Sequence, residues 1–120
     1  MKALFDTCIL IDYLNGIEAA RGELAIYREK HISAITWVEV LVGAVAATEP
    51  ATRRFLDGFH LVEVDGAVRE ETVALRRAYR IKLPDAMIWA SARAHALTLV
   101  TRNTKDFTET LPRIRIPYHL

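Results

Sequence analysis

Four acidic side chains lie where predicted elements of this sequence begin or end, and they are the residues best placed for chemistry. Asp6 ends a short apolar strand, Glu39 lies early in an apolar helix, Asp85 follows Pro84 at a helix start, and Asp106 follows a buried strand. Clustered carboxylates repel one another, so a group of them without Lys or Arg partners is best explained by a bound metal. All-oxygen ligands suit Mg²⁺ or Mn²⁺ rather than zinc or copper.

Each acid also has a structural interpretation. Helix starts and turns favour such residues in any protein, which applies to Asp6, Asp85 and the pair Asn103 and Asp106. Thr36-x-x-Glu39 matches a capping box, in which the glutamate bonds back to the helix start. Glu39 nevertheless favours a functional interpretation, because it is the only charged residue between positions 32 and 47, and burying an unpaired carboxylate is costly. Three similar acids are interpreted as structural: Asp12, Asp57 and Asp65.

The elements that must position these acids alternate along the chain. Apolar periodicity and turn residues predict strands at 2–5, 31–35, 59–64, 97–101 and 114–116. Helices are predicted at 7–15, 18–30, 36–47, 50–58, 65–79 and from Pro84 onward. This order predicts an α/β fold, a three-layer α/β/α sandwich around a mostly parallel sheet of about five strands. Ligands of such sheets bind beyond the carboxyl ends of the strands, although the sequence does not fix the side on which Asp85 lies.

Composition narrows the class of protein. The 120 residues predict one domain, and the net charge of +1 means that any nucleic-acid affinity must come from local basic patches. The single cysteine, Cys8, excludes an internal disulfide and is interpreted as a small buried hydrophobe. The sequence begins MKALFDT, without the apolar run of a signal peptide, and no apolar stretch is long enough to span a membrane. We therefore expect a cytoplasmic protein.

Four motifs in order resemble the PIN-domain ribonucleases, and in particular their VapC branch, the toxins of bacterial and archaeal toxin–antitoxin pairs. The motifs are a strand ending in Asp6-Thr7, then Ser33-x-x-Thr36-x-x-Glu39-x-x-x-Gly43, Pro84-Asp85-Ala86-x-Ile88-x-Ala90, and Thr101-Arg102-Asn103-x-x-Asp106-Phe107. The resemblance covers nearly the whole chain, from position 2 to about 116, and implies a single PIN domain over residues 1–120.

The resemblance implies a role for each matching residue. Asp6, Glu39 and Asp85 would be the three principal acids. The fourth place falls between positions 103 and 106, where Asp106 would be the acid and Asn103 a helper. In the family, hydroxyl groups beside the metals occupy the positions that match Thr7 and Thr101.

The function implied is a metal-dependent endoribonuclease toxin. Its carboxylates would hold Mg²⁺ or Mn²⁺, which activates the water that attacks phosphorus and leaves 5′-phosphate and 3′-hydroxyl ends. Partners implied by the resemblance are an RNA substrate, a cognate antitoxin that seats a helix in an apolar groove and places a basic side chain at the acids, and a second copy of the chain in a homodimer. The alternative is a PIN-like module that only binds a protein or RNA. A dehalogenase-type phosphatase is excluded because it needs an aspartate where Cys8 stands.

Basic residues flank the acidic motifs and are candidates for holding RNA. The predicted phosphate contacts are Arg80 and Lys82 before Asp85, and Arg102 and Lys105 before Asp106. The alternative is that these side chains simply form a solvated surface. No residue of the sequence indicates which bases would be read.

Overall fold

A five-stranded parallel sheet forms the centre of the computed structural model, which describes residues 2–120. The strands are β1 (Lys2–Phe5), β2 (Glu29–Ser33), β3 (His60–Val62), β4 (Thr98–Val100) and β5 (Ile114–Arg115). Their order across the sheet is β3-β2-β1-β4-β5, and every neighbouring pair is parallel. The first strand of the chain therefore lies in the middle of the sheet, while β3 and β5 lie at its edges.

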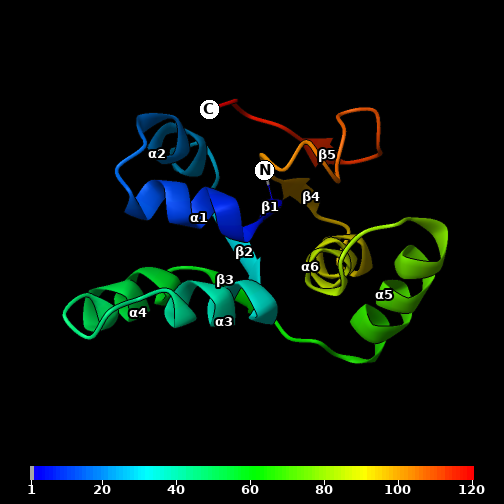
Figure 1. Cartoon of the computed structure of the whole chain (residues 1–120), viewed down its shortest axis with the longest axis horizontal. Helices are drawn as coiled ribbons and strands as arrows, with labels where there is room; N and C mark the ends of the chain where they lie inside the picture. Colours follow the sequence, from blue (N-terminus) through cyan, green and yellow to red (C-terminus); the bar gives the residue numbers. More distant parts are fainter. Residues whose placement is uncertain (1) are drawn as a thin grey trace.

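Six helices cover the two faces of this sheet (Figure 1). The helices α1 (Thr7–Leu14), α2 (Glu18–Ala25), α3 (Ala34–Val42) and α4 (Glu49–Asp57) lie on one side. The helices α5 (Gly66–Ala78) and α6 (Leu83–Ala94) pack together on the other. The predicted three-layer α/β/α sandwich is thus confirmed. Among residues 2–120, no helix is long and apolar enough to cross a membrane.

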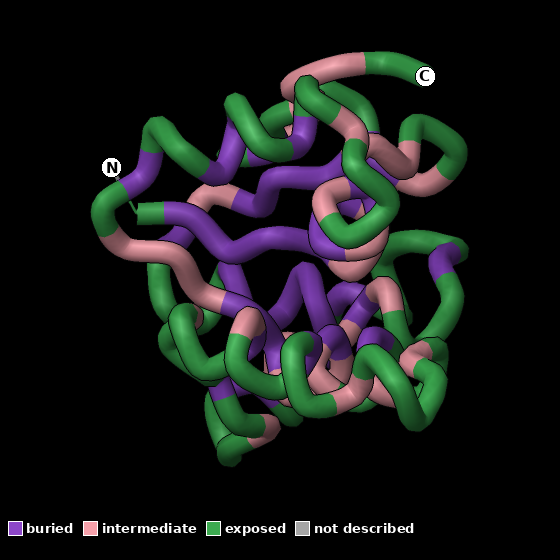
Figure 2. Tube along the Cα trace, turned by 90° about the vertical axis from the view of Figure 1, so that its left-hand side faces the viewer, coloured by how far each residue is buried: buried purple, intermediate pink, exposed green. Residues whose placement is uncertain are grey.

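Alternation along the strands divides the core between the two faces. Leu4 and Leu99 belong to the cluster under α5 and α6, whereas Ala3, Phe5 and Val100 belong to the cluster under α1 to α4. Successive side chains of a strand point to opposite faces, so a strand covered on both sides must be apolar at every position. Figure 2 shows the result, with buried segments running through the middle of the fold and exposed ones around it.

Two helices have bounds that differ from the prediction by more than one residue. The helix predicted at 18–30 ends at Ala25, and β2 already begins at Glu29, because Glu29 and Lys30 pair with the first residues of β1. Pairing in the sheet outweighs the helix propensity of these residues. The helix predicted at 36–47 instead runs from Ala34 to Val42 and ends at Gly43; it begins earlier because the Ser33 hydroxyl accepts a hydrogen bond from the amide of Ile35 at 3.1 Å.

Two buried carboxylates are each bound by one arginine and one tyrosine. Asp12 on α1 accepts hydrogen bonds from Arg102 at 2.6 and 2.8 Å and from the Tyr118 hydroxyl at 2.7 Å. Glu23 on α2 has the same arrangement, with Arg115 at 2.7 and 2.9 Å and Tyr27 at 2.8 Å. Burial opposes ionisation of both acids, but the hydrogen bonds from arginine and tyrosine lower each pKa overall. These two clusters join the C-terminal part of the chain to α1 and α2.

Candidate active site

An open cavity of about 470 Å³ lies beyond the carboxyl end of β1. Its walls come from four separate parts of the chain: Asp6, Thr7 and Cys8; Glu39; Asp85; and Arg102, Asn103, Thr104 and Lys105. Strands β1 and β4 are parallel neighbours, and the amide of Asp6 donates to the carbonyl of Val100 at 2.9 Å. This pairing brings the residues after both strands to the same edge of the sheet, where α/β proteins bind ligands.

Asp6 is buried at this edge, with only 5% of its surface exposed. One carboxylate oxygen accepts a hydrogen bond from the Thr7 amide at 2.7 Å, and the other accepts one from the Thr101 hydroxyl at 2.7 Å. Burial raises the pKa of Asp6, the hydrogen bonds from Thr101 and Thr7 oppose that rise, and the charge of Glu39 adds to it. Asp6 therefore caps α1 and also forms part of the cavity wall, so the structural and functional interpretations apply to the same residue.

Glu39 reaches the cavity from α3 and is positioned by Thr7. The Thr7 hydroxyl donates to Glu39 Oε1 at 2.6 Å and lies 3.0 Å from the hydroxyl of Thr36. The capping box considered for Thr36 and Glu39 does not form, because Ser33 caps the helix. The expectation that Glu39 would be buried is also wrong, since α3 is covered on one side only and Glu39 lies on its exposed side.

Asp85, in the first turn of α6, lies at the same edge as the other acids. Burial raises its pKa to about 6, and the negative charges of Asp6, Asp106 and Glu39 contribute to the rise, which Lys82 partly offsets. The pKa of Asp85 is thus affected by the charges of all three of the other predicted acids. Asp6, Glu39 and Asp85 line the same cavity, whereas Asp106 does not line it and is joined to its wall through Asn103.

Asn103 and Asp106 act as a linked pair after β4. The Asn103 side chain donates to Asp106 Oδ2 at 2.9 Å, and its backbone amide donates to the Thr101 hydroxyl at 3.0 Å. Asn103 itself lines the cavity. Buried Phe107, whose ring packs edge-on against Trp89 at 5.4 Å, holds the end of this turn in place.

The four basic residues that were predicted to contact RNA differ in their surroundings. Lys105 lines the cavity, and Arg80 and Lys82 are exposed without an ion-pair partner among residues 2–120. Arg102 also borders the cavity, but its guanidinium is engaged by Asp12, which gives it a structural role that the sequence did not indicate. No local pattern could have found this contact, because 90 residues separate the two.

Cys8 is only half buried and borders the cavity, rather than lying wholly within the core as expected. Its sulfur lies 3.8 Å from the Thr101 hydroxyl. Burial and the nearby charge of Asp6 raise the pKa of the thiol to about 11, so it stays protonated and does not act as a nucleophile at neutral pH.

The donor groups of the cavity suit a hard divalent cation. The acids and their hydroxyl and amide neighbours offer oxygen ligands, and their mutual repulsion would be relieved by a positive ion. Among residues 2–120, no three acidic, histidine or cysteine side chains lie close enough to enclose an ion by themselves. An open arrangement fits Mg²⁺, which typically keeps several of its waters and binds through one or two carboxylates.

Replacing Asp85 with Asn should stabilise the metal-free protein at neutral pH. The pKa of Asp85 rises on folding, from 3.8 to about 6, so its ionised form weakens the fold increasingly as pH rises through that interval. Removing the charge should then raise Tm at pH 8 by roughly 4 °C, or about 1 kcal/mol after allowance for solvent screening, and have little effect at pH 4. Thermal melts in a chelator at both pH values measure this, and a lower Tm for the variant at pH 8 would contradict it.

Comparisons with known proteins agree with this fold. The model of the PIN domain family matches residues 3–110. A chain in a toxin–antitoxin complex from Klebsiella pneumoniae is 45% identical, with a TM-score of 0.93 over 98% of this chain and 99% of that chain. VapBC2 from Rickettsia felis, bound to a DNA fragment from its promoter, is 21% identical, with a TM-score of 0.81 over 100% of this chain and 99% of that one.

A third solved structure, FitAcB from Neisseria gonorrhoeae, is 24% identical and has a TM-score of 0.78, with 100% of both chains covered. At this identity, the Rickettsia and Neisseria proteins show a shared fold. A comparison with curated proteins found no significant match.

Proposed function

Because this chain belongs to the PIN domain family, we propose that it is the toxin of a toxin–antitoxin pair and that it cleaves RNA with Mg²⁺ or Mn²⁺. The main support is that three of the predicted acids, Asp6, Glu39 and Asp85, line one open cavity, while Asp106 is hydrogen-bonded to Asn103 in its wall. A chain 45% identical to this one occurs in a toxin–antitoxin complex, which supports the biological role.

In this proposal the protein's own residues orient the reacting groups. Asp6, Glu39 and Asp85 supply oxygen ligands, and Asp106 adds negative charge behind Asn103. When bound, the divalent ion supplies a Lewis acid for the phosphodiester and lowers the pKa of a water molecule. Hydrogen bonds from Thr101 and Thr7 fix the carboxylates of Asp6 and Glu39 before substrate arrives, which reduces the reorganisation that the reaction requires.

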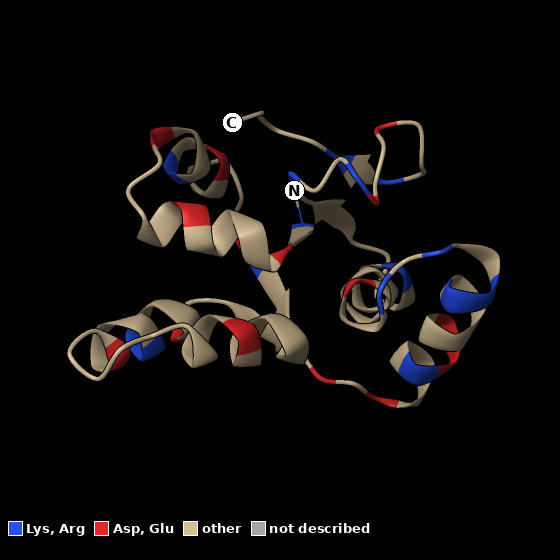
Figure 3. Cartoon of the chain, viewed as in Figure 1, with Lys and Arg blue, Asp and Glu red and all other residues tan. Residues whose placement is uncertain are grey.

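Lys105 lines the acidic cavity and Lys82 lies near enough to Asp85 to lower its pKa, so both lysines border the acids and would hold the phosphates next to the one that is cut. Arg80 extends this basic border along the chain segment that enters α6. Figure 3 shows basic residues on α5 and on the connection between α5 and α6. Because the net charge is only +1, RNA affinity should depend on this local border and fall steeply with salt.

Removing divalent ions tests the proposal directly. The purified chain is incubated with a mixture of cellular RNAs in Mg²⁺, in Mn²⁺ and in excess chelator, and the ends of the fragments are identified. We expect cleavage only with metal, giving 5′-phosphate and 3′-hydroxyl ends. Cleavage that persists in chelator, or fragments ending in cyclic phosphates, would rule out this mechanism. Tight RNA binding without any cleavage would favour the alternative of a non-catalytic RNA-binding module.

A groove on the α1–α2–α4 side offers a seat for the proposed antitoxin. It has a volume of about 410 Å³ and is lined by Tyr13, Arg21, Leu24, Ala25, Lys30, Phe55, Gly58 and Phe59. The rings of Tyr13 and Phe55 stack at 4.7 Å, which gives the groove a rigid apolar wall suited to the apolar face of a helix.

Replacing Phe55 with Asp should release the antitoxin and leave RNA cleavage unchanged. Retention of the complex would place the antitoxin elsewhere.

Inhibition by the antitoxin would involve a basic side chain at the acids. A guanidinium matches carboxylate geometry, so it would occupy the place of the metal, and inhibition should weaken as Mg²⁺ rises.

The exposed residues Val38, Val42 and Val45, on and after α3, are proposed as part of a homodimer contact. Sedimentation of the free toxin as a monomer would exclude that dimer.

A further inference from the structure

Tyr79 lies on the short segment between α5 and α6, and its ring is exposed although it is firmly supported. The tyrosine ring packs against the ring of Trp89 on α6, with ring centroids 5.0 Å apart and planes tilted by 56°. Tyr79 is 39% exposed, whereas Trp89 is 1% exposed. Within the described chain the hydroxyls of Tyr27 and Tyr118 donate to carboxylates, but that of Tyr79 has no such bond.

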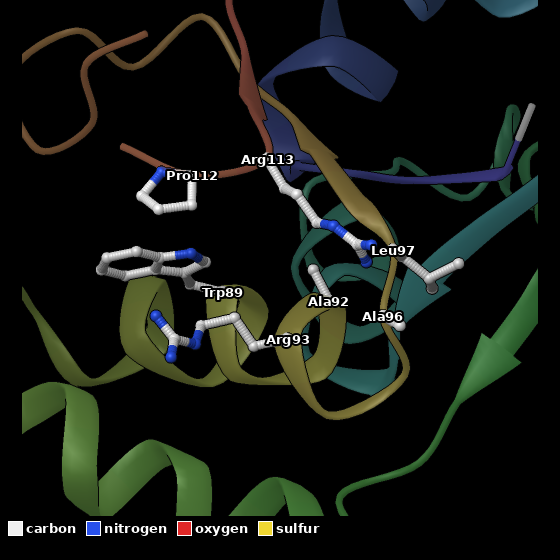
Figure 4. A pocket seen from close by; sticks show the side chains of 7 residues that line it. All are labelled: Trp89, Ala92, Arg93, Ala96, Leu97, Pro112 and Arg113. Carbon is white, nitrogen blue, oxygen red and sulfur yellow. The ribbon is translucent and has the colours of Figure 1, made fainter. Parts of the chain in front are cut away.

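Trp89 is itself held from several directions. Arg93 lies over its ring at 5.8 Å, and Phe107 packs edge-on against it at 5.4 Å. Figure 4 shows Pro112 and Arg93 on opposite sides of the indole. The tyrosine ring therefore rests on an indole that cannot move away, so its exposed surface stays in one place.

The segment that carries Tyr79 is also anchored to the body of the protein. Buried Ile81 is only 6% exposed, and its carbonyl accepts a hydrogen bond from Arg76 of α5. On either side of Ile81, Arg80 and Lys82 are exposed and have no ion-pair partner among residues 2–120. A fixed aromatic ring beside free cations is the combination by which proteins hold unpaired nucleotides, stacking a base and contacting its phosphate.

The indole that supports this ring belongs to the same helix as Asp85. Asp85 and Trp89 are four residues apart on α6, so they lie about one turn, or roughly 6 Å, apart along the helix axis. A base on Tyr79 would thus belong to a nucleotide near the phosphate that is cut.

We propose that Tyr79 stacks on an unpaired base of the RNA, next to the cleavage site, while Arg80 and Lys82 hold its phosphates. This inference rests on the proposed ribonuclease function and adds a residue that positions the substrate. It implies that the preferred RNA is single-stranded at that nucleotide, because a base within a duplex has no free face for the ring. The contact would affect binding of the substrate more than the chemical step, since Tyr79 is not among the acids.

Two substitutions separate stacking from support of the fold. Tyr79→Leu keeps an apolar cover over Trp89 but removes the aromatic face, and Tyr79→Phe keeps both and serves as the matched control. Both variants are compared with the wild-type protein in two measurements: the Tm, and the kinetics of cleavage of an RNA that the wild type cuts. We expect Tyr79→Leu to raise KM about tenfold with kcat nearly unchanged, and Tyr79→Phe to behave as wild type. An unchanged KM in Tyr79→Leu would overturn the proposal, as would an equal loss in both variants.

A series of RNAs, each lacking one base near the cut, then identifies the stacked nucleotide. At one position the missing base should weaken binding to the wild type, and there Tyr79→Leu should cause no further loss. A penalty of the same size at every position would overturn the stacking contact. If Tyr79→Leu weakens only antitoxin binding, the ring is a protein contact and the inference is wrong. If wild-type protein neither binds nor cuts RNA, the failure lies instead with the proposed function.

Discussion

Replacing Asp6 with Asn should reduce RNA cleavage by about a thousandfold while leaving the fold intact. The carboxylate is buried, and both of its oxygens are oriented by hydrogen bonds from Thr7 and Thr101, so it is the most firmly positioned acid of the cavity. Asn has nearly the same shape but lacks the charge that holds a divalent ion, and removing one preorganised electrostatic contact typically costs a factor of 10²–10³. Initial rates of RNA cleavage in saturating Mg²⁺ measure the effect.

The control for this experiment is Asp57→Asn, which removes the same charge from the exposed end of α4. We expect it to cleave at the wild-type rate. The Asp6 variant should have an unchanged or slightly higher Tm in chelator, because one member of a repelling group has lost its charge. An Asp6→Asn protein that is folded and still fully active would show that this carboxylate takes no part in the reaction.

Replacing Asp12 with Ala should destabilise the protein by about 2–3 kcal/mol, because hydrogen bonds to a buried carboxylate are lost while the partly exposed Arg102 regains water. Asp12 is 4% exposed and accepts three hydrogen bonds, two from Arg102 and one from Tyr118. Its loss would free the C-terminal segment from α1 and release the residue that precedes Asn103. Unfolding in urea, with the slope compared between variants, gives the change in free energy.

A double variant separates the contact from the cost of an unpaired group. Asp12→Ala combined with Arg102→Ala should be less destabilised than the sum of the two single variants, because neither partner then remains alone. Asp57→Ala again serves as the exposed control, with a change below about 0.5 kcal/mol. Strict additivity of the two single variants would show that the short distances between Asp12 and Arg102 carry no coupling energy.

Much of the architecture could be predicted because its signals are local. Apolar runs such as those at 2–5 and 97–101 indicate strands covered on both faces, and Pro84 and Asp65 mark helix starts where the structure has them. The gathering of the four acids could be expected for those that follow strands, since parallel strands share one carboxyl edge. The position of Asp85 could not, because it opens the helix before β4 and only the packing of α6 decides its side.

Other features depend on contacts that no local pattern contains. Helix α2 ends at Ala25 because Glu29 and Lys30 pair with strand β1, although these two residues favour a helix. Glu39 was expected to be buried because the residues around it are apolar, yet the protein covers only one side of α3. The partnership of Asp12 with Arg102 links residues 90 positions apart and defines a structural role for an arginine that otherwise resembles an RNA contact.

Strand β1 is synthesised first but lies at the centre of the sheet, so its two neighbours arrive at very different times. β2 follows within 30 residues, whereas β4, which is followed directly by the Thr101 that donates to Asp6, comes almost 100 residues later. Asp85 and Asp106 also belong to the last third of the chain. A partly synthesised chain therefore holds Asp6 and Glu39 but lacks the other half of the proposed catalytic group. The proposed activity would therefore arise only when the chain is nearly complete, after the residues that line the groove of α1, α2 and α4 have all been synthesised.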